Sequence, residues 1–333
     1  MKPIAVVLLN YNGLKLLQQF FPSVVQNSPQ AQIYIADNGS TDGSQIYIAE
    51  HFPEVRWIAL DRNYGYAGGY NHALKWVEEP IWCLLNTDVE VTPDWLAPVI
   101  DLFEKNPSVG IIQPKILDYN RKNYFEYAGA AGGYIDKYGF PYCRGRIFDT
   151  IEQDTNQYTS GPIFWASGAC FFVKKSSFEQ LGGFDEDFFA HQEEIDLCWR
   201  AFNQNIHTYY CNESTIYHVG GATLHKSNPK KTFLNFRNSL YMIYKNAPLP
   251  GRFWLLFQRL SWDGLAGILF VLQGKPLHCW AIIRSHFAFY AHISQLKKKR
   301  TNIDAKPHYF KIKSIVLHYF LKKNKRFSHI HDS

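Results

Sequence analysis

The sequence has few cysteines and no recognisable leader segment. No two of the cysteines have the spacing of a disulfide framework or of a zinc site; they are Cys83, Cys143, Cys170, Cys198, Cys211 and Cys279. The amino-terminal apolar run covers only residues 4–9, and no small-residue cleavage site follows it. A signal peptide needs a longer run, so we expect a cytoplasmic protein.

Two common nucleotide-binding motifs are also missing. The first predicted strand is followed by Asn10-Tyr11-Asn12-Gly13, where a dinucleotide-binding site would have G-x-G-x-x-G. The Gly-Lys-Ser/Thr of a P-loop does not occur. A sheet formed by this chain would therefore bind a nucleotide-like ligand by other means.

Charge is distributed unevenly along the 333 residues. Residues 251–333 hold 15 Lys/Arg against 3 Asp/Glu, whereas residues 1–250 hold 20 against 26. Hydrophobic residues make up 46% and aromatic residues 17%, which is enough for one large domain with a smaller appendage. An acidic body followed by a basic region suggests two separate roles.

Short apolar runs alternate with helical patterns in the first third of the chain. Strands are predicted at residues 4–9, 33–36, 55–59 and 81–85, and helices at 14–26 and 73–77. This order predicts βαβ units and a parallel sheet. Each polar loop follows the carboxyl end of a strand, which is the edge where open α/β sheets bind ligands.

The second third has a different pattern. Residues 111–160 are rich in Gly, Tyr and Pro, which predicts hairpins inserted on the acceptor side. A buried strand is expected at 164–173, and two further strands at 206–210 and 215–217. A small-residue break at Ser167-Gly168-Ala169 indicates either the close approach of a ligand or a bulge.

The fourth predicted strand ends in oxygen-bearing side chains. Residues 81–91 read IWCLLNTDVEV, so Asn86, Asp88 and Glu90 share one face if the chain stays extended. Oxygen ligands clustered in this way suit a hard cation such as Mg²⁺ or Mn²⁺. Taken alone, the same residues also fit a polar turn without a ligand.

Two other loops could contact a nucleotide. Asp37 ends the second strand and could hydrogen-bond a base or ribose, while Asp42 could cap the next helix. Residues 62–71 read RNYGYAGGYN and place three glycines near a helix start, where backbone amides could approach a diphosphate. A strand-to-helix turn and a flexible loop explain the two segments equally well.

Acidic residues and a histidine follow in the second half. Glu193 and Glu194 stand at a predicted helix start, where structure could hold one and leave the other free as a general base. Asp196 lies four residues before Arg200, which predicts an ion pair along the helix. His218 ends a strand and could complete a metal site begun by Asp88, or be a structural histidine.

Together these segments resemble the family 2 glycosyltransferases, in particular the rhamnosyltransferase-like branch. The matching segments run in family order over about residues 4–225 and read VVLLNYNG, ADNGSTDGS, RNYGYAGGYNHAL, LLNTDVEV, SGACFFVKKSSFEQLGGFDEDFF, HQEEIDLCWR and IYHVGGAT. The resemblance implies a GT-A fold in the α/β class, with a mixed, mostly parallel central sheet flanked by helices. It also implies a catalytic domain at 1–228, with a nucleotide-sugar-binding half at 1–110 and an acceptor half at 111–228.

The resemblance further implies an inverting transfer from a nucleoside-diphosphate sugar that needs Mg²⁺ or Mn²⁺. Asp88 would bind metal and diphosphate, and His218 would be a further metal ligand. Glu194 would be the base, with Glu193 as the alternative, because the family more often has Asp at position 194. The remaining implied contacts are Asn10, Asp37, Asn63, Gly65, Asn71 and Asn86 on the donor, and Ser167, Gly168 and Arg237 on the acceptor side.

The carboxyl-terminal part is predicted as a helical region at 229–300 and a basic tail at 301–333. Residues 253–272 are apolar enough for a membrane span, but Arg259 and Asp263 interrupt them, at about 2.5–3.5 kcal/mol for each charge in the bilayer centre. We expect instead a helix pair that lies in a membrane interface.

In that arrangement Trp254, Trp262 and Trp280 lie at the headgroups, and the basic runs at 297–300 and 322–326 meet anionic lipid. A solvated helical tail packed on the body is the alternative. A nucleic-acid partner is not expected, because no recognition motif accompanies the basic residues.

The sequence therefore predicts a glycosyltransferase that moves a sugar, expected to be rhamnose, to a glycan or lipid-linked acceptor in cell-surface polysaccharide synthesis. We expect it to be peripheral on the inner face of the cell membrane. The alternatives are the same fold with a UDP-hexose donor and a non-catalytic protein that binds nucleotide sugars or glycans. The presence of Asp88, Glu194 and His218 together argues against the non-catalytic alternative.

Overall fold

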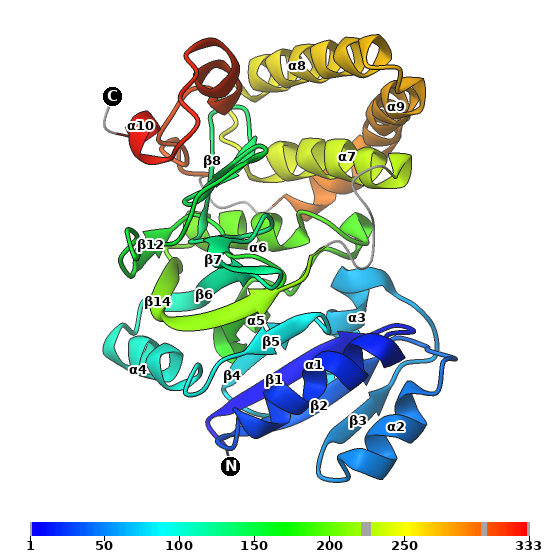
Figure 1. The fold of residues 1–333 in the computed structure, drawn as a ribbon. Helices are drawn as coiled ribbons and strands as arrows, with labels where there is room; N and C mark the ends of the chain where they lie inside the picture. The colour runs from blue at the N-terminus through cyan, green and yellow to red at the C-terminus, as the bar shows by residue number, and fades with distance from the viewer. Residues whose placement is uncertain (1, 221–227, 301–304, 332–333) are drawn as a thin grey trace.

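A central sheet runs through the first 218 residues of the computed structural model, which describes residues 2–220, 228–300 and 305–331 (Figure 1). Its strand order is β12-β14-β6-β13-β4-β1-β2-β3, with β5 added beside β14 and β7 beside β6. Both predicted halves thus share one sheet.

The amino-terminal half consists of neighbouring parallel strands joined by helical crossovers, in the sheet order β4-β1-β2-β3. Its elements are β1 (Ile4–Asn10), α1 (Leu14–Gln26), β2 (Ala31–Asp37), α2 (Ser44–His51), β3 (Arg56–Ala59), α3 (Gly65–Ala73), a 3₁₀ turn (Leu74–Trp76) and β4 (Ile81–Leu85). Strand β1 pairs in parallel with β2 and β4, and β2 pairs in parallel with β3. The predicted parallel sheet is confirmed. The helix before β4 starts at Gly65, inside the segment expected to be a loop, and not at residue 73.

Alternate residues of the buried strands supply two separate cores. On β1, Ile4, Val6 and Leu8 pack with α1, α2 and α4, whereas Ala5 and Val7 pack with α3 and α6 on the other face. Successive side chains of a strand point to opposite faces, so a strand covered on both faces is apolar throughout. This explains why β1 and β4 are continuous apolar runs.

The second half makes the sheet mixed. Its elements are β5 (Val89–Val91), α4 (Ala97–Lys105), β6 (Val109–Asp118), β7 (Arg121–Phe125), β12 (Gly161–Ile163), β13 (Cys170–Lys174), α5 (Lys175–Gln180), a 3₁₀ turn (Glu186–Phe188), α6 (Glu193–Asn203) and β14 (His207–His218). Strand β13 runs antiparallel to β4 and β6. The prediction of one strand at 164–173 is wrong, since β13 begins only at Cys170. Two strands were predicted between 206 and 217, but β14 is one strand with a bulge between Cys211 and Thr215.

The predicted hairpin insertion forms a small antiparallel sheet of its own. It consists of β8 (Gly133–Ile135), β9 (Pro141–Cys143), β10 (Arg146–Ile147) and β11 (Thr150–Ile151). The chain then returns through β12 to the central sheet. All six cysteines are free thiols, and the closest pair, Cys83 and Cys170, has sulfurs 3.8 Å apart.

Three long helices gather at the end of the molecule opposite β3 and α2 (Figure 1). They are α7 (Pro229–Asn246), α8 (Arg252–Leu272) and α9 (Pro276–Lys299). In the described part of the chain, α8 alone is long and apolar enough to cross a membrane, with a mean hydropathy of 1.4. The two charged residues in its middle, Arg259 and Asp263, are buried and form an ion pair of 2.8 Å. Trp262 also faces inward and packs on Tyr138.

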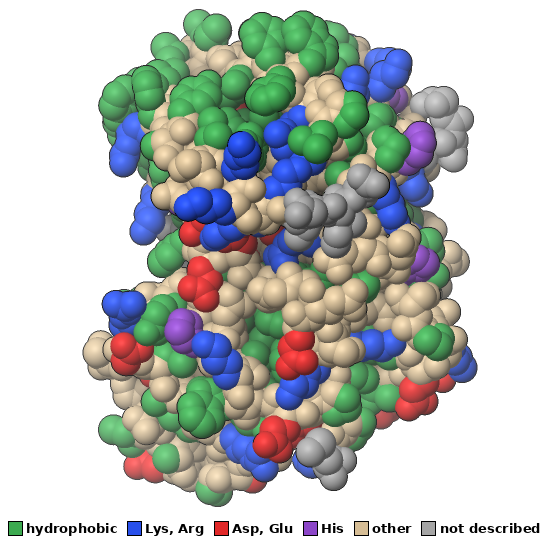
Figure 2. All heavy atoms as spheres, turned by 180° about the vertical axis from the view of Figure 1, so that it is seen from behind, with side chains coloured by type: hydrophobic (Ala, Val, Ile, Leu, Met, Phe, Trp, Pro, Cys, Tyr) green, Lys and Arg blue, Asp and Glu red, His purple; other side chains and the backbone are tan. Residues whose placement is uncertain are grey.

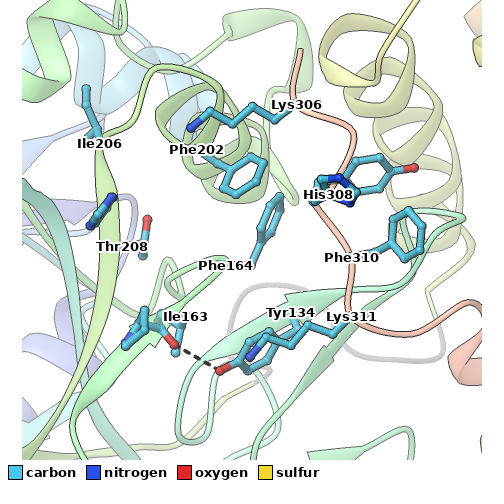
Figure 3. Close-up of a pocket in the computed structure, with 13 residues that line it drawn as sticks. Tyr134, Ile163, Phe164, Phe202, Ile206, Thr208, Lys306, His308, Phe310 and Lys311 are labelled. Atoms are coloured by element: carbon cyan, nitrogen blue, oxygen red, sulfur yellow. Dashed lines mark hydrogen bonds between the residues drawn. The ribbon is translucent and has the colours of Figure 1, made fainter. Parts of the chain in front are cut away.

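The basic tail packs against the body. It contains a π-helical turn (Leu317–Leu321) and α10 (Ser328–His331). The Ile315 amide donates to the Asp136 carboxylate at 2.9 Å, and the Tyr309 hydroxyl donates to the Lys137 carbonyl at 2.7 Å. Between the tail and strands β12 and β14 lies a cavity of about 300 Å³ (Figure 3). None of the predicted site residues lines this cavity.

Candidate active site

The carboxyl ends of β1 and β2 place two predicted donor contacts side by side. Asn10 and Asp37 are paired in register, and the Asn10 amide donates to the Asp37 carboxylate at 3.1 Å. The Ser40 amide donates to the other oxygen of Asp37, also at 3.1 Å. These bonds orient an acidic group at the sheet edge where nucleotides bind in such folds.

A second loop supports the first. The Asn63 side chain accepts from the amide of Gly65 at 2.8 Å and from the Asn38 amide group at 3.2 Å. Asn63 therefore orders the start of α3 and lies next to the residue that follows Asp37. Gly39 has a φ of +80°, and a Cβ there would lie 2.9 Å from the Cα of Arg62. The two loops can approach this closely only because position 39 is glycine.

Asp88 and His218 form the predicted pair at the end of β4. Asp88 Oδ1 lies 3.1 Å from His218 Nε2, and the two residues are only 5% and 4% exposed. Burial acts to raise the pKa of Asp88, but the His218 imidazole opposes it and the net pKa lies below the ordinary value. The amide nitrogen of Asn86 lies 3.5 Å from the same imidazole nitrogen. The structure therefore brings together the three residues predicted for this end of the site.

The expectation that Asn86, Asp88 and Glu90 share one face is wrong. It required an extended chain, but β4 ends at Leu85 and the chain turns before β5. Strand β5 pairs with β14, which is how Asp88 comes to lie beside His218. Glu90 is turned away and pairs with Lys122.

Glu126 belongs to this site and was missed by sequence reasoning. Its carboxylate lies 3.5 Å from His218 Nδ1, on the side of the ring away from Asp88. Burial acts to lower the pKa of His218, but Glu126 and then Asp88 raise it to about 10. The residue lies in an irregular segment after β7 that has no motif, so only the folded chain reveals it. Glu126 orients the imidazole, as carboxylates behind metal-binding histidines commonly do.

These residues fit a divalent cation. His218 Nε2 and Asp88 Oδ1 offer one nitrogen and one oxygen 3.1 Å apart, and Glu126 lies at the other ring nitrogen, Nδ1. Mg²⁺ and Mn²⁺ sites commonly use one or two carboxylates together with substrate phosphates, and imidazole suits Mn²⁺. Over residues 2–220, 228–300 and 305–331, no three His, Cys, Asp or Glu side chains complete such a site alone. Residues 221–223 of the IYHVGGAT segment lie outside the described residues.

Glu193 and Glu194 begin α6, and both have a carboxylate oxygen without a hydrogen-bond partner. Burial, and then the charge of Glu194, raise the pKa of Glu193 well above its ordinary value. Burial raises the pKa of Glu194 to about 7. Burial thus favours the uncharged form of Glu193, and Glu194 is able to gain and lose a proton near neutral pH.

Contacts between neighbouring loops connect the Asp88–His218 pair to the Glu193–Glu194 pair. The backbone amide of Asn86 donates to the Ala169 carbonyl at 3.0 Å, and the Tyr66 hydroxyl donates to the adjacent Gly168 carbonyl at 2.7 Å. The pKa of Tyr66 is raised mainly by burial, and in part by the charges of Glu193 and Glu194. The Tyr66 backbone amide donates to the Phe189 carbonyl at 2.8 Å, so Tyr66 connects the loop beside the end of β4 to the segment before α6.

The family model for glycosyl transferase family 2 matches residues 5–182, which is more than half of the chain. The chain belongs to this family. A family 2 glycosyltransferase uses nucleotide-sugar donors, and this accounts for acidic and amide side chains at the sheet edge without a glycine-rich phosphate motif.

Two curated relatives are similar to more than half of this chain. The N-acetylglucosaminyl-diphospho-decaprenol L-rhamnosyltransferase of Mycobacterium tuberculosis is 27% identical over 212 residues, which is 58% of this chain and 68% of that protein. The low-salt glycan biosynthesis hexosyltransferase Agl10 of Haloferax volcanii is 23% identical over 244 residues, which is 71% of this chain and 73% of that protein.

Solved structures of similar fold are glycosyltransferases with bound donors or products. GalNAc-T7 with UDP, GalNAc and Mn²⁺ superposes with a TM-score of 0.60 at 13% identity, over 89% of this chain and 58% of that chain. Staphylococcus aureus TarS 1–349 with UDP-GlcNAc gives a TM-score of 0.59 at 14% identity, over 90% and 84%. The predicted GT-A fold is confirmed.

The glycine-rich segment of the transferase has a different role from the one predicted. Gly65 has a φ of +74°, and a Cβ there would lie 2.5 Å from the carbonyl oxygen of Phe189. That carbonyl accepts from the amide of Tyr66 at 2.8 Å. The backbone amides of Tyr66 and Ala67, at the start of α3, thus donate to the segment before Glu193. This corrects the expectation that the amides at this helix start approach a diphosphate.

Two other predicted contacts have structural partners. Asn71 exchanges hydrogen bonds with the backbone of Phe184 and also donates to Glu186. Ser167 is buried, its amide donates to Gln113 and its hydroxyl accepts from the amide of Ala169. We assign Asn71 to the junction between α3 and the 184–186 segment, and Ser167 to the break before β13.

The segment before the glutamates is unusual in its backbone. Phe189, His191 and Gln192 have φ values of 63°, 71° and 70°, which non-glycine residues adopt rarely. Such conformations persist only when surrounding contacts impose them, and they occur often at functional sites. A support for this segment is therefore expected from a neighbouring element.

Helix α7 provides that support through Arg237 and Asn238. The buried Asn238 amide nitrogen lies 3.1, 2.9 and 2.7 Å from the carbonyl oxygens of Phe188, Ala190 and His191. Arg237 donates to the Asn238 side chain and to the Phe188 carbonyl. Arg237, which was predicted on the acceptor side, thus holds the segment that presents the glutamates. Asn238 was not predicted as a site residue.

Asn238→Ala is expected to lower kcat by about 10–100-fold with little change in the KM for the donor, because a small misplacement of a catalytic group is costly. It should also lower the free energy of unfolding by about 2 kcal/mol, because buried carbonyls lose their donor. Steady-state kinetics and thermal unfolding measure both effects.

Asn203→Ala is the matched control for this variant. Asn203 is also a buried asparagine, but it donates to the Asn246 carbonyl and does not touch the 188–192 segment. It should lose stability and keep its kcat. Equal losses of kcat in both variants would contradict a positioning role for Asn238.

The pH profile of the transferase should follow the ionisation of Glu194. A base acts only when deprotonated, so kcat/KM is expected to rise with pH through about 7 and to level off above it. Initial rates are measured at saturating metal from about pH 5.5 to about pH 9, which lie on either side of this pKa. A profile that is flat through 7 in the wild type would contradict it.

Stability should change in the opposite direction over the same range. The folded-state pKa of Glu194 lies above its ordinary value of 4.5, so the folded protein binds more protons than the unfolded chain between about 4.5 and 7. The free energy of unfolding therefore falls as pH rises through this window. Glu194→Gln should remove part of that fall, which thermal unfolding at pH values within and above the window will show.

Proposed function

We propose that this transferase is an inverting, metal-dependent enzyme that moves rhamnose from a nucleoside-diphosphate donor to a glycan or lipid-linked acceptor in cell-surface polysaccharide synthesis. The observation that carries the proposal is the contact path from Asp88–His218 through Gly168 and Tyr66 to Glu193–Glu194. It connects the Asp88–His218 pair after β4 to the segment that leads into the two glutamates.

The residues of the chain have distinct tasks in this reaction. Asp37 and Asn10 orient the nucleoside part of the donor. Asp88 and His218 would hold the divalent ion, which when bound stabilises the negative charge that develops on the diphosphate leaving group. Asn86 and Glu126 keep the His218 ring in place.

The transfer itself is a single displacement. The acceptor hydroxyl oxygen forms a bond to the anomeric carbon while the bond from that carbon to the diphosphate oxygen breaks. Glu194 takes the hydroxyl proton, and the electron pair of the broken bond leaves with the diphosphate. Attack from the face opposite the leaving group inverts the anomeric configuration, and no covalent enzyme intermediate forms.

The names of the relatives support the proposed donor and acceptor. The mycobacterial relative is named as a rhamnosyltransferase with a lipid-linked acceptor, and the Haloferax relative as a hexosyltransferase. A UDP-hexose donor is the second candidate, because solved neighbours contain UDP or UDP-GlcNAc. A lipid-linked acceptor would place the protein in the cytoplasm, peripheral on the inner face of the cell membrane.

A donor panel tests the proposed function. Purified full-length protein is assayed for nucleoside-diphosphate release with rhamnose, glucose, galactose and N-acetylhexosamine donors, each with Mn²⁺, Mg²⁺ or a chelator. The proposal predicts highest turnover with the rhamnose donor and none with the chelator. Tight binding of a nucleotide sugar without turnover under any condition would instead support a binding protein.

A further inference from the structure

The outward sides of α8 and α9 are apolar where a helix on a soluble protein is polar. Sixteen of the 21 exposed large apolar side chains in the described ranges lie in these helices and the tail. On α9 the exposed residues recur every three or four positions as Leu277, Trp280, Ile283, Phe287 and Tyr290. On α8 they are Trp254 and Phe257 in the first half and Leu265, Ile268 and Leu272 in the second half. We call these ten residues the outer apolar face. Figure 2 shows apolar side chains gathered at this end of the molecule.

The charges within α8 lie on its inner side. Arg259 pairs with Asp263, donates to the Tyr138 carbonyl at 3.1 Å and lies 3.8 Å from the centre of the Phe140 ring. A membrane-spanning α8 would pull this pair out of its contacts and into lipid. Lying flat, α8 keeps the pair against the small sheet and turns its apolar stripe outward, which is the arrangement of an interfacial helix.

The charged residues around this face are of one sign. In the described part of residues 251–333, Asp263 is the single acidic residue and it is buried, whereas the exposed charged side chains are all basic. They include Lys275 at the turn between α8 and α9, Arg284 on α9, and the tail residues Lys322, Lys323, Lys325 and Arg326. A second copy of the chain would bring the same positive charge to the contact. An anionic lipid surface complements it.

We infer that the outer apolar face docks on an anionic membrane with α8 and α9 lying in the interfacial plane. Trp254 and Trp280 lie at the headgroups, as tryptophan does at membrane boundaries. The inference rests on the proposed location of the enzyme, but lipid binding needs no sugar. Helix α9 also touches the active-site region, because Lys299 pairs with Asp185 and Asp187 just before the 188–192 segment. Docking thus presents the acceptor side of the site to lipid-linked substrates.

Vesicle binding by the full-length protein tests this inference. Flotation is measured with phosphatidylcholine vesicles that contain or lack one quarter phosphatidylglycerol, for the wild type and two double variants. Trp254→Ser with Ile268→Ser removes residues that are 62% and 59% exposed on the outer apolar face. Trp76→Ser with Ile46→Ser is the matched control, with residues that are 70% and 64% exposed elsewhere.

Wild type and control should bind anionic vesicles equally, and the α8 variant should bind at least tenfold more weakly. Neutral vesicles should bind the wild type at least fivefold more weakly, and bound protein should transfer to vesicles added later, which a spanning helix prevents. Equal binding by all three proteins, or no binding by the wild type, would overturn the inference. A wild type that is dimeric in solution and does not bind vesicles, with a monomeric α8 variant, would show a protein interface instead. Diphosphate release with a water-soluble acceptor, measured in parallel, reports separately on the sugar chemistry.

Discussion

Glu194→Gln is expected to lower kcat for sugar transfer by about 10²–10⁴-fold, the range that a general base contributes. Glutamine has the same shape but cannot take the acceptor proton. The KM for the donor should change little, because the donor contacts at Asp37 and Asp88 are intact. Rates of nucleoside-diphosphate release in the presence of acceptor, with saturating donor and Mn²⁺, measure the effect.

Glu193→Gln is the matched control. Burial and the charge of Glu194 raise the pKa of Glu193, which favours its uncharged form, so an uncharged amide is a close substitute for it. Its kcat should stay within about tenfold of the wild type. The reverse result, with Glu193→Gln inactive and Glu194→Gln active, would move the base to Glu193. Wild-type transfer by both variants would remove the pair from catalysis.

Asp88→Asn is expected to lower transfer at least about 100-fold, since several kcal/mol of charge stabilisation depend on the cation and each 1.36 kcal/mol is tenfold. The asparagine keeps the contact with His218 but loses the charge that attracts the cation. Mn²⁺ binding followed by electron paramagnetic resonance, in the presence of nucleoside diphosphate, should weaken in parallel with activity.

Glu90→Gln is the control for this variant. Glu90 is two residues away on β5 and pairs with Lys122, so both metal binding and transfer should remain close to the wild type. If Asp88→Asn bound Mn²⁺ and transferred sugar as the wild type does, the cation site at Asp88 and His218 would be wrong.

The central sheet was predictable because its strands are buried on both faces. Continuous apolar runs such as residues 4–9 and 81–85 can pack in only a few ways, and the polar loops after them fall at one edge. Helix α1 was predicted with its observed bounds because its apolar residues repeat on one face. The strand predicted at 164–173 failed, since Trp165 pairs only with Gly133 in an isolated bridge and the chain turns before β13 begins at Cys170.

Within the site, residues carried by a motif were found and residues carried by tertiary contact were missed. Asp88 and His218 meet because β5 pairs with β14, which agrees with their predicted partnership. Glu126 and Asn238 act through contacts with residues distant in the sequence, and neither has a local pattern that marks it. The residues around Gly65 were misread, because a glycine needed for packing against Phe189 has the same sequence signature as one that approaches phosphate.

The anomeric configuration of the product tests the account most directly. The reaction uses the preferred donor and a water-soluble lipid-diphosphate sugar acceptor. Proton NMR of the product reports the anomeric configuration of the new glycosidic bond. Single displacement with Glu194 as the base predicts a product whose configuration is inverted relative to the donor. A retained configuration would contradict it, because retention requires a different path from donor to acceptor than one attack assisted by one base.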